Sequence, residues 1–240
     1  TSADTLSGGT ASLTDSANNK TATKAIIVGY GSIGENAFQN ASSLTEITIG
    51  ASVTKIGEYA FYGASNLESV IFEAGSQLKS IGKQAFYNAT SLTEINIPAS
   101  VTSIGIGAFS GATILSNITF SEGSAITSIG NYAFSGAKGL TSITIPASVT
   151  SIGQHAFQGT TNLTSITIPA SVTSIAPGAF YQSGLTTVYI ANNQTIGTTT
   201  ITSPATEAVS FFGKDNVTIK LPNEGEGEGE GEGDDVGVGD

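Results

Sequence analysis

The sequence predicts a repeat solenoid, mostly β, in which short strands stack in parallel and short α or 3₁₀ turns lie on the opposite side. A Ser-Ile-Gly tripeptide or a near variant recurs about every 23 residues, and self-similarity at a fixed period of this size is characteristic of a solenoid. An Ala-Phe pair ends five residues after each isoleucine. The isoleucines are Ile33, Ile56, Ile81, Ile104, Ile129, Ile152 and Ile175, and the phenylalanines are Phe38, Phe61, Phe86, Phe109, Phe134, Phe157 and Phe180.

Each unit is predicted to form one coil. Residues 92–97, Leu-Thr-Glu-Ile-Asn-Ile, alternate in polarity and contain β-branched residues, which indicates a short strand that Pro98 ends. Gly105 follows the repeated isoleucine and suits a turn that needs a positive φ. Its expected equivalents are Gly34, Gly57, Gly82, Gly130 and Gly153. The Ala-Phe segment is too short for a long helix, so a single α or 3₁₀ turn is expected there.

Stacking of the coils is required for burial, because no single unit can cover its own Ile, Phe and Leu side chains. Strands of neighbouring coils should lie about 4.8 Å apart, with Ile95, Ile118, Ile143 and Ile166 in one internal ladder. Two long units, from Ile56 to Ile81 and from Ile104 to Ile129, carry a pair of extra residues after the strand. Gly-containing turns at 73–76 and 121–124 replace Pro-Ala-Ser there. Because both insertions occur at the same point of the repeat, they are predicted to mark one edge of the solenoid.

The pattern Ser-Ile-Gly-x-x-Ala-Phe-x-x-x-x-x-Leu-x-x-Ile-x-Ile-Pro resembles the BspA-like, or Treponema-type, leucine-rich repeats. The resemblance covers about residues 25–190, and the period falls within the leucine-rich-repeat range. It implies a leucine-rich-repeat solenoid similar to those of bacterial surface adhesins, of protist surface proteins and of proteins of marine viruses and phages. The family often has Cys where this chain has a small residue that we expect to be buried, at Ala41, Ala64, Ala89, Ala112 and Ala137.

Four segments are expected along the chain. Residues 1–24 form a leader rich in Ser, Thr and Gly, as a flexible linker or an extra capping strand, and residues 25–190 form the solenoid of about seven units, with 25–28 as its first strand. Residues 191–222 form a C-terminal cap with a degenerate repeat, in which Ile219 corresponds to Ile95. Residues 223–240 form an acidic Glu-Gly tail, for which disorder is favoured over a calcium site because EF-hand spacing is missing.

Composition excludes several classes of function. The net charge is −11, but residues 224–240 hold eight of the 19 acidic residues, so the rest of the chain is nearly neutral. All eight basic residues are lysines, and a chain without a cationic surface is not expected to bind nucleic acid. No apolar run approaches the roughly 20 residues of a membrane-spanning helix. The chain has no Cys, and the absence of Met even at position 1 suggests that it is processed or excised from a longer protein.

No enzyme active site is predicted, and no cofactor or metal is expected. The single histidine, His155, occupies a variable column and is predicted to be an exposed polar residue. Residues 29–34 fit G-x-G-x-x-G, but they belong to the repeat's own turn, and no long helix follows to complete a dinucleotide site. Glu46 and Glu94 lie two coils, or roughly 10 Å, apart, which is too far for two carboxylates to share a proton.

The outward strand positions are predicted to form a neutral, hydroxyl-rich binding face. Protein hot spots favour Trp, Tyr and Arg, and only Tyr189 qualifies here, so the face suits weak, multivalent contacts. A soluble spacer without a ligand is the alternative. The residues of this candidate face are Glu46, Thr48, Glu94, Asn96, Asn117, Thr119, Ser142, Thr144, Ser165, Thr167, Thr187 and Tyr189. A second aromatic set, Tyr59, Tyr62, Tyr87, Tyr132 and Tyr181, is interpreted as half-buried packing or as a contact surface.

These observations favour a secreted or surface-displayed recognition or adhesion module that binds protein or glycan, located extracellularly, on a cell or on a virion. The alternative is a structural building block that self-assembles into a filament, sheath or spike, since head-to-tail contacts of solenoids make open filaments. Seven N-x-[ST] sequons are candidate glycosylation sites if the source permits. They begin at Asn19, Asn40, Asn88, Asn117, Asn162, Asn193 and Asn216.

Overall fold

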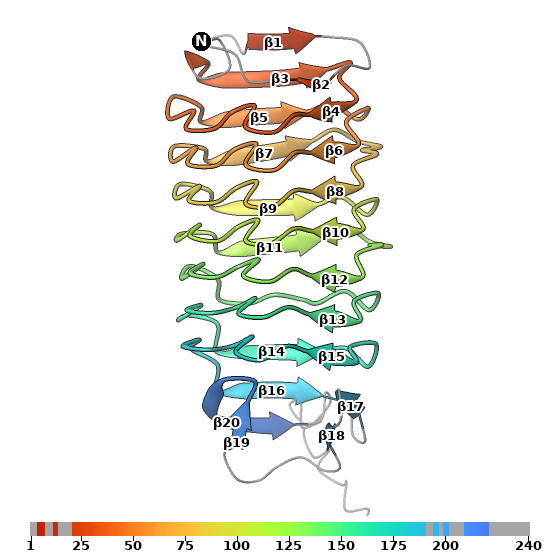
Figure 1. The fold of residues 1–240 in the computed structure, drawn as a ribbon, viewed down its shortest axis with the longest axis vertical. Coiled ribbons are helices and arrows are strands. Elements are labelled where there is room, and N and C mark those ends of the chain that lie inside the picture. Colours follow the sequence, from red (N-terminus) through yellow and green to blue (C-terminus); the bar gives the residue numbers. More distant parts are fainter. Residues whose placement is uncertain are drawn as a thin grey trace, which may run out of the picture.

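The protein is a column of stacked coils in a computed structural model (Figure 1). The structure describes residues 4–7, 12–13, 21–190, 194–196, 199–201 and 209–220, with side chains over 21–190 and 212–220. Most coils contribute one longer strand, one two-residue strand and one segment of turns. The predicted parallel solenoid is therefore confirmed.

The longer strands form the back of the column in Figure 1 and run parallel in register. Ile47 pairs with Val70, Ile95 with Ile118 and Ile166 with Val188. These strands are β1 (Asp4–Ser7), β3 (Lys24–Val28), β5 (Glu46–Ile49), β7 (Ser69–Phe72), β9 (Glu94–Ile97), β11 (Asn117–Phe120), β14 (Ser165–Ile168), β16 (Thr187–Ile190) and β20 (Lys214–Lys220).

The two-residue strands form a second parallel sheet that runs unbroken through eight coils. Its register joins each repeated isoleucine to the next, as in the pairs of Ile81 with Ile104 and of Ile104 with Ile129. These strands are β2 (Ser12–Leu13), β4 (Ser32–Ile33), β6 (Lys55–Ile56), β8 (Ser80–Ile81), β10 (Ser103–Ile104), β12 (Ser128–Ile129), β13 (Ser151–Ile152) and β15 (Ser174–Ile175).

The Ala-Phe segments form successive turns, so the α or 3₁₀ turn expected there is wrong. Between residues 22 and 190 the structure contains no helix. The Phe61 N–H donates to the Ala85 carbonyl of the next coil at 2.7 Å, whereas the Tyr62 N–H donates to Tyr59 within its own turn at 3.0 Å. Alternate backbone groups thus bond between coils, which a helix could not allow because it would use them internally.

The glycine after each repeated isoleucine has a different role from the predicted one. Gly105 and its equivalents do not have positive φ. A Cβ on Gly105 would instead lie 2.7 Å from the Gly82 carbonyl carbon and 2.7 Å from the Lys83 nitrogen. Close approach of consecutive coils, and not backbone conformation, therefore favours glycine at this position. The glycines for which the predicted positive φ is wrong are Gly34, Gly57, Gly82, Gly105, Gly130 and Gly153.

The left-handed backbone conformation occurs two residues later in each unit. This column, which the sequence suggested was a variable surface position, has φ between 52° and 69° throughout. A second left-handed column follows four residues further along. The first column is Asn36, Tyr59, Gln84, Gly107, Tyr132, His155 and Gly178, and the second is Asn40, Gly63, Asn88, Gly111, Gly136, Gly159 and Gln182.

Replacing Gln84 by glycine is expected to raise the free energy of unfolding by about 0.5–1 kcal/mol. A left-handed conformation costs an L-residue about 1–2 kcal/mol, which glycine avoids, but the greater entropy of glycine in the unfolded chain offsets part of this gain. Gln84 has a φ of 52°. Urea denaturation measures the change. The matched control is Gln154→Gly, at an exposed residue without positive φ, which should lose about 0.5–1 kcal/mol. Equal losses in both variants would contradict the assignment.

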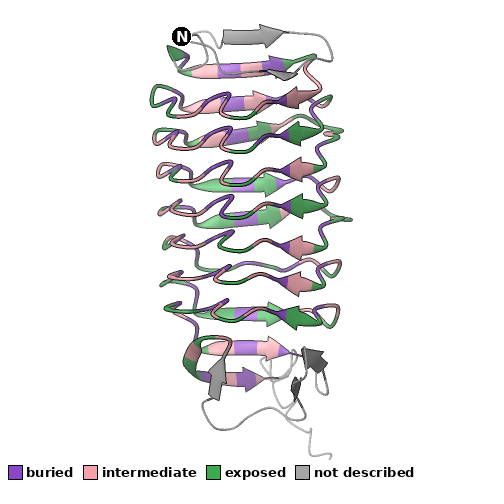
Figure 2. Cartoon of the chain, viewed as in Figure 1, coloured by how far each residue is buried: buried purple, intermediate pink, exposed green. Residues whose placement is uncertain are grey.

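Buried ladders run the length of the column (Figure 2). Ile95, Ile118, Ile143 and Ile166 are all at most 7% exposed, which confirms the predicted internal ladder. The seven repeated phenylalanines are fully buried, and their rings stack at centroid separations of 4.9–5.6 Å. The column of small residues is also fully buried, at Ala41, Ala64, Ala89, Ala112 and Ala137.

Both ends of the column carry additional strands. At the N-terminal end β1 pairs in parallel with β3, and β2 pairs with β4, so residues 25–28 form the second strand of their sheet. At the C-terminal end β20 pairs in parallel with β16, and Ile219 takes the register position that follows Val188. Strand β19 (Val209–Phe211) then pairs with β20 in the antiparallel sense, and β17 (Gln194–Ile196) pairs with β18 (Thr199–Ile201). The Glu-Gly tail lies outside the described residues.

Candidate binding surface

The long-strand sheet presents the outward side chains that the sequence assigned to the binding face. Eight of the twelve predicted residues are exposed: Glu94, Asn96, Asn117, Thr119, Ser142, Thr144, Ser165 and Thr167. Glu46, Thr48, Thr187 and Tyr189 are half-buried, because they lie near the two ends of the column. The face is therefore most accessible across its middle coils.

This sheet is interrupted after each long unit. Strands β5 and β7 pair, and β9 and β11 pair, but within the described residues no ladder joins β7 to β9. In the coil that follows β11, the long-strand position forms no strand but a single parallel bridge, between Thr144 and Thr167. The two-residue strands remain continuous across the same coils. The longer turns therefore separate neighbouring strands on one side of the column only.

A hollow lies at each interruption. The larger one, of about 700 Å³, extends over β7, β9 and β11, and the longer turn at 73–76 forms one wall. The smaller one, of about 470 Å³, extends from β11 to residue 148, with the turn at 121–124 as its wall. Asn117, Thr119 and Ser121 line both hollows, so the two depressions adjoin along the column. The predicted distinct edge is thus the rim of a groove.

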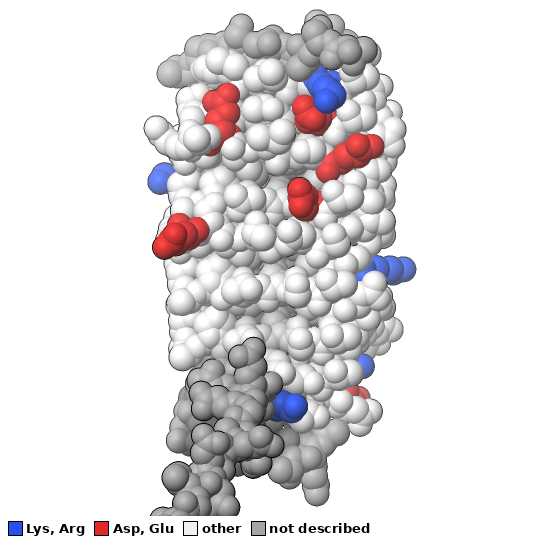
Figure 3. All heavy atoms as spheres, turned by 180° about the vertical axis from the view of Figure 1, so that it is seen from behind, with Lys and Arg blue, Asp and Glu red and all other residues white. Residues whose placement is uncertain are grey.

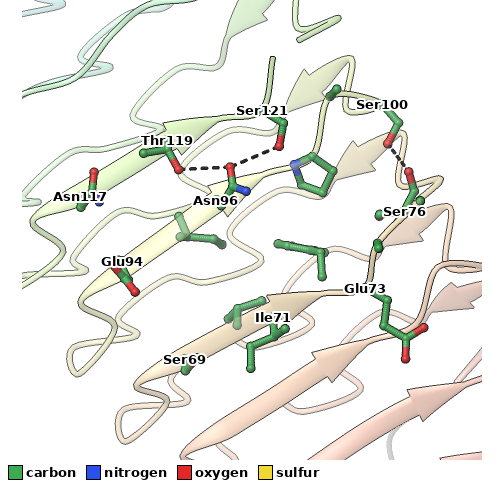
Figure 4. A pocket seen from close by; sticks show the side chains of 17 residues that line it. Ser69, Ile71, Glu73, Ser76, Glu94, Asn96, Ser100, Asn117, Thr119 and Ser121 are labelled. Carbon is green, nitrogen blue, oxygen red and sulfur yellow. Dashed lines mark hydrogen bonds between the residues drawn. The ribbon is translucent and has the colours of Figure 1, made fainter. Parts of the chain in front are cut away.

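Asn96 is fixed in the larger hollow by hydroxyl groups from the next coil (Figure 4). Its Oδ1 accepts hydrogen bonds from Thr119 Oγ1 at 3.1 Å and from Ser121 Oγ at 3.3 Å. With Oδ1 facing these two hydroxyls, the Asn96 Nδ2 is left as a donor. Glu94 and Ile71, which is 45% exposed, lie on the same surface.

Negative charge gathers over the N-terminal half of this face, and the rest is almost uncharged (Figure 3). Glu46 is paired with Lys24 at 3.1 Å, and both side chains are partly exposed. Glu73 accepts a hydrogen bond from the Ala51 N–H at 3.1 Å, which holds its carboxylate at the rim. No lysine in the described part of the chain lines either hollow. The surface is consequently unsuited to anionic ligands such as nucleic acid phosphates.

Sequence reasoning missed the residues of the rim and inner walls. Glu73, Ser76 and Ser100 line the larger hollow, and half-buried Phe72 and Phe120 line one hollow each. Two features of the sequence could have identified them together. The long units carry extra residues after the strand, and the same two units have phenylalanine at a strand position where the other units have isoleucine. Of the sequons, the one at Asn117 lines both hollows.

The remaining sequons lie away from the hollows or beyond the described residues. Asn40, Asn88, Asn162 and Asn216 are exposed, so each stays a candidate for glycosylation. Asn19 and Asn193 lie outside the described residues.

The aromatic residues of the turn side pack against one another. The rings of Tyr62 and Tyr87 stack at 4.9 Å. His155 is half-buried, stacks on Tyr132 at 5.0 Å and meets Tyr181 edge-on at 6.2 Å, so the prediction that it is a simple exposed polar residue is wrong. Its Nδ1 is buried without a hydrogen-bond partner in the described residues. Stacking explains why a histidine fits a column that also holds tyrosines.

Lys83 lies beside this aromatic group, with its Nζ 5.5 Å from the centre of the Tyr59 ring. A side-chain hydrogen bond with Tyr59 raises the pKa of Lys83 above its ordinary value. Among the described residues no cluster of three or more His, Asp and Glu side chains is arranged to hold a metal ion. None of the helices in that part of the chain has the length and apolar composition needed to cross a bilayer.

The family model described as the BspA type leucine rich repeat region matches residues 31–127 and 79–204. The chain belongs to this family. A leucine rich cell surface protein from Faecalibacterium prausnitzii A2-165 is 34% identical, with a TM-score of 0.63 over 73% of this chain and 52% of that one. A search of curated proteins finds no significant match.

A leucine-rich repeat protein from Bacteroides ovatus ATCC 8483 is similar in fold, with a TM-score of 0.52 and 24% identity over 78% of this chain and 61% of that one. This BspA type chain thus spans between half and two thirds of the length of these two solved proteins. Both likenesses support the leucine-rich-repeat architecture.

Proposed function

We propose that the chain is a non-enzymatic recognition module that acts at a cell surface or in the extracellular space and binds a protein or glycan through its long-strand face. The observation that carries this proposal is the pair of adjoining hollows on that face. They are lined by exposed amide, hydroxyl and carboxylate groups, and they occur where the sheet is interrupted. A concave surface with a few fixed polar groups is the usual form of a ligand site.

The remaining surface offers fewer features for recognition. The two-residue strands form a continuous narrow sheet, and many hydroxyl groups beside them are already used within the protein. Thr102 and Thr150 donate to backbone carbonyl groups of the preceding coil at 3.1 Å each. Hydroxyls that bond to the backbone contribute to the stack, whereas those of the long-strand face have capacity for a ligand. This difference favours the long-strand face.

The alternative of a filament building block is less well supported. Stacking end to end would require both ends of the long-strand sheet to offer an edge for a parallel strand. The N-terminal end presents β1, which is paired with β3. At the other end, the antiparallel strand β19 lies beyond β20 in the sheet and covers the edge that a further parallel strand would need. An ordinary head-to-tail stack is therefore disfavoured.

A triple variant tests the proposed face. Thr119→Lys, Thr144→Lys and Thr167→Lys together place three long cations across the middle coils, where all three threonines are exposed. We expect the variant to lose attachment to cells and extracellular matrix, because the lysines introduced in place of Thr119 and Thr144 obstruct the hollows and all three add positive charge to an almost uncharged surface. Attachment of protein-coated beads, counted under flow, measures the effect.

The matched control carries Thr102→Lys, Thr127→Lys and Thr150→Lys, which add the same charge to exposed positions beside the two-residue strands. This control should attach like the original protein. Equal attachment of both triple variants would show that the long-strand face does not carry recognition.

A further inference from the structure

The two hollows are copies of one another, separated by two coils. Each is lined by the same residue types from the same positions of the repeat, and the second set lies two units further along the chain. The first set is Phe72, Gly75, Ser76, Pro98 and Ser100, and the second is Phe120, Gly123, Ser124, Pro146 and Ser148. Phenylalanine at this strand position is confined to the two long units. The hollows therefore share a construction and are expected to share a ligand.

Hydrogen bonding within the two hollows is also alike. Ser100 Oγ donates to the Leu78 carbonyl at 2.8 Å, and Ser148 Oγ donates to the corresponding Ile126 carbonyl at 2.7 Å. Each hydroxyl is thus oriented by a carbonyl of the preceding coil, as Ser171 is by the Val149 carbonyl in a unit without the longer turn, and its lone pairs remain as acceptors. The walls combine these fixed acceptors with the half-buried phenylalanine and with proline, which supply apolar surface.

The shared lining is uncharged. Glu73 and Glu94 line the larger hollow, but none of the described residues that line the smaller hollow is charged. A cationic peptide would gain charge complementarity in only one of the two hollows, and an anionic polymer would be repelled by the carboxylates. A neutral ligand rich in hydroxyl groups fits both, since its hydroxyls can donate to the serine oxygens of either hollow. In the larger hollow they can also donate to the carboxylates and accept from the Asn96 Nδ2.

We propose that the two hollows bind successive segments of one neutral, linear glycan that lies along the column. Two coil steps place the hollows roughly 10 Å apart. A polymer that repeats the same groups can occupy both hollows at once, and the second contact is then intramolecular and increases the apparent affinity. The inference rests on the proposed function of the long-strand face and names the ligand class of that face.

Isothermal titration calorimetry tests the inference with four neutral hexasaccharides: cellohexaose, xylohexaose, mannohexaose and chitohexaose. At least one should bind saturably to the full chain. Phe72→Ile or Phe120→Ile should each weaken that binding by about a hundredfold, since one of two linked contacts is lost, and the double variant should show no binding. Isoleucine is the residue at the same strand position in other units, as in Ile97 and Ile145, so the variants should fold.

The matched control is Ser103→Ala, at an exposed residue of β10 on the other sheet, which should bind as tightly as the original chain. No binding of any of the four hexasaccharides would overturn the inference. Unchanged binding in the double variant would also overturn it, as would binding of decalysine in place of the sugars. If the sugars fail but the threonine-to-lysine variant on the same face loses cell attachment, the recognition function stands and only the ligand class is wrong.

Discussion

Replacing Phe109 by alanine is expected to lower the free energy of unfolding by about 3–5 kcal/mol. The Phe109 ring is fully buried, between Phe86 at 5.2 Å and Phe134 at 5.6 Å. Its removal leaves a cavity in the middle of the phenylalanine ladder and ends two stacking contacts. Because stability in a solenoid is a sum of terms between neighbouring units, the change also weakens the coupling of the two halves of the column.

Urea denaturation followed by circular dichroism measures this loss, and a split of the single transition into two would report the weakened coupling. Ile106→Ala is the matched control, because Ile106 lies in the same coil but is 49% exposed, and it should cost less than about 0.5 kcal/mol. A loss below about 1 kcal/mol for Phe109→Ala would mean that the coils do not depend on the ladder.

Gly105→Ala is expected to destabilise the protein by about 2–3 kcal/mol, toward the upper end of overpacking penalties. The three atoms nearest to the new Cβ, at 2.7–2.9 Å, all belong to the backbone of the preceding coil. A backbone cannot rotate away like a flexible side chain, so the coils on one side must shift relative to those on the other. Ala176 occupies the equivalent position in the seventh unit, near the end of the column, where we expect a Cβ to cost less because fewer coils must adjust to it.

Thermal and urea denaturation of Gly105→Asn distinguish the two explanations for this glycine. Asparagine tolerates positive φ better than other residues, so it would be accepted if conformation mattered. Because contact with the preceding coil matters instead, Gly105→Asn should be at least as destabilising as Gly105→Ala. The control is Gly123→Ala, which has no atom within 4 Å of the added Cβ but a φ of 74°, and which should cost about 1 kcal/mol. Full stability of Gly105→Asn would refute the steric account.

Much of the fold is predictable because the repeat aligns chemically equivalent residues. The ladder through Ile95 and Ile118 follows from the alternation of polarity in the strand, and the buried phenylalanines follow from their invariance along the chain. The role of Gly105 was not predictable, since glycine serves both tight approach and positive φ, and the sequence does not distinguish these uses. The left-handed column was concealed because Tyr59, Gln84 and Tyr132 are not residue types that signal it, although Asn36 and Gly107 in the same column are.

The candidate face was predicted in outline, and its shape was not. Period-2 alternation placed Asn96 and Thr119 outward correctly, because a strand has only two faces. The position of the longer turns could be read from the spacing of the repeated isoleucines, but the separation of β7 from β9 depends on how those turns pack in three dimensions. The contributions of Phe72 and Ser100 to a hollow therefore became evident only from the structure.

The extra pair of residues in a long unit lies outside every buried column, because residues 73–75 are exposed and the ladder resumes at Leu78. A lengthened turn can thus be gained by one repeat and lost by another with only apolar-for-apolar changes in the core, since Leu78 and Ile126 stand where the short units have valine. Each such exchange would move a hollow by one coil along the column. Chains that share this core can consequently diversify their recognition surfaces by insertion and deletion, with few accompanying substitutions such as that of isoleucine by phenylalanine.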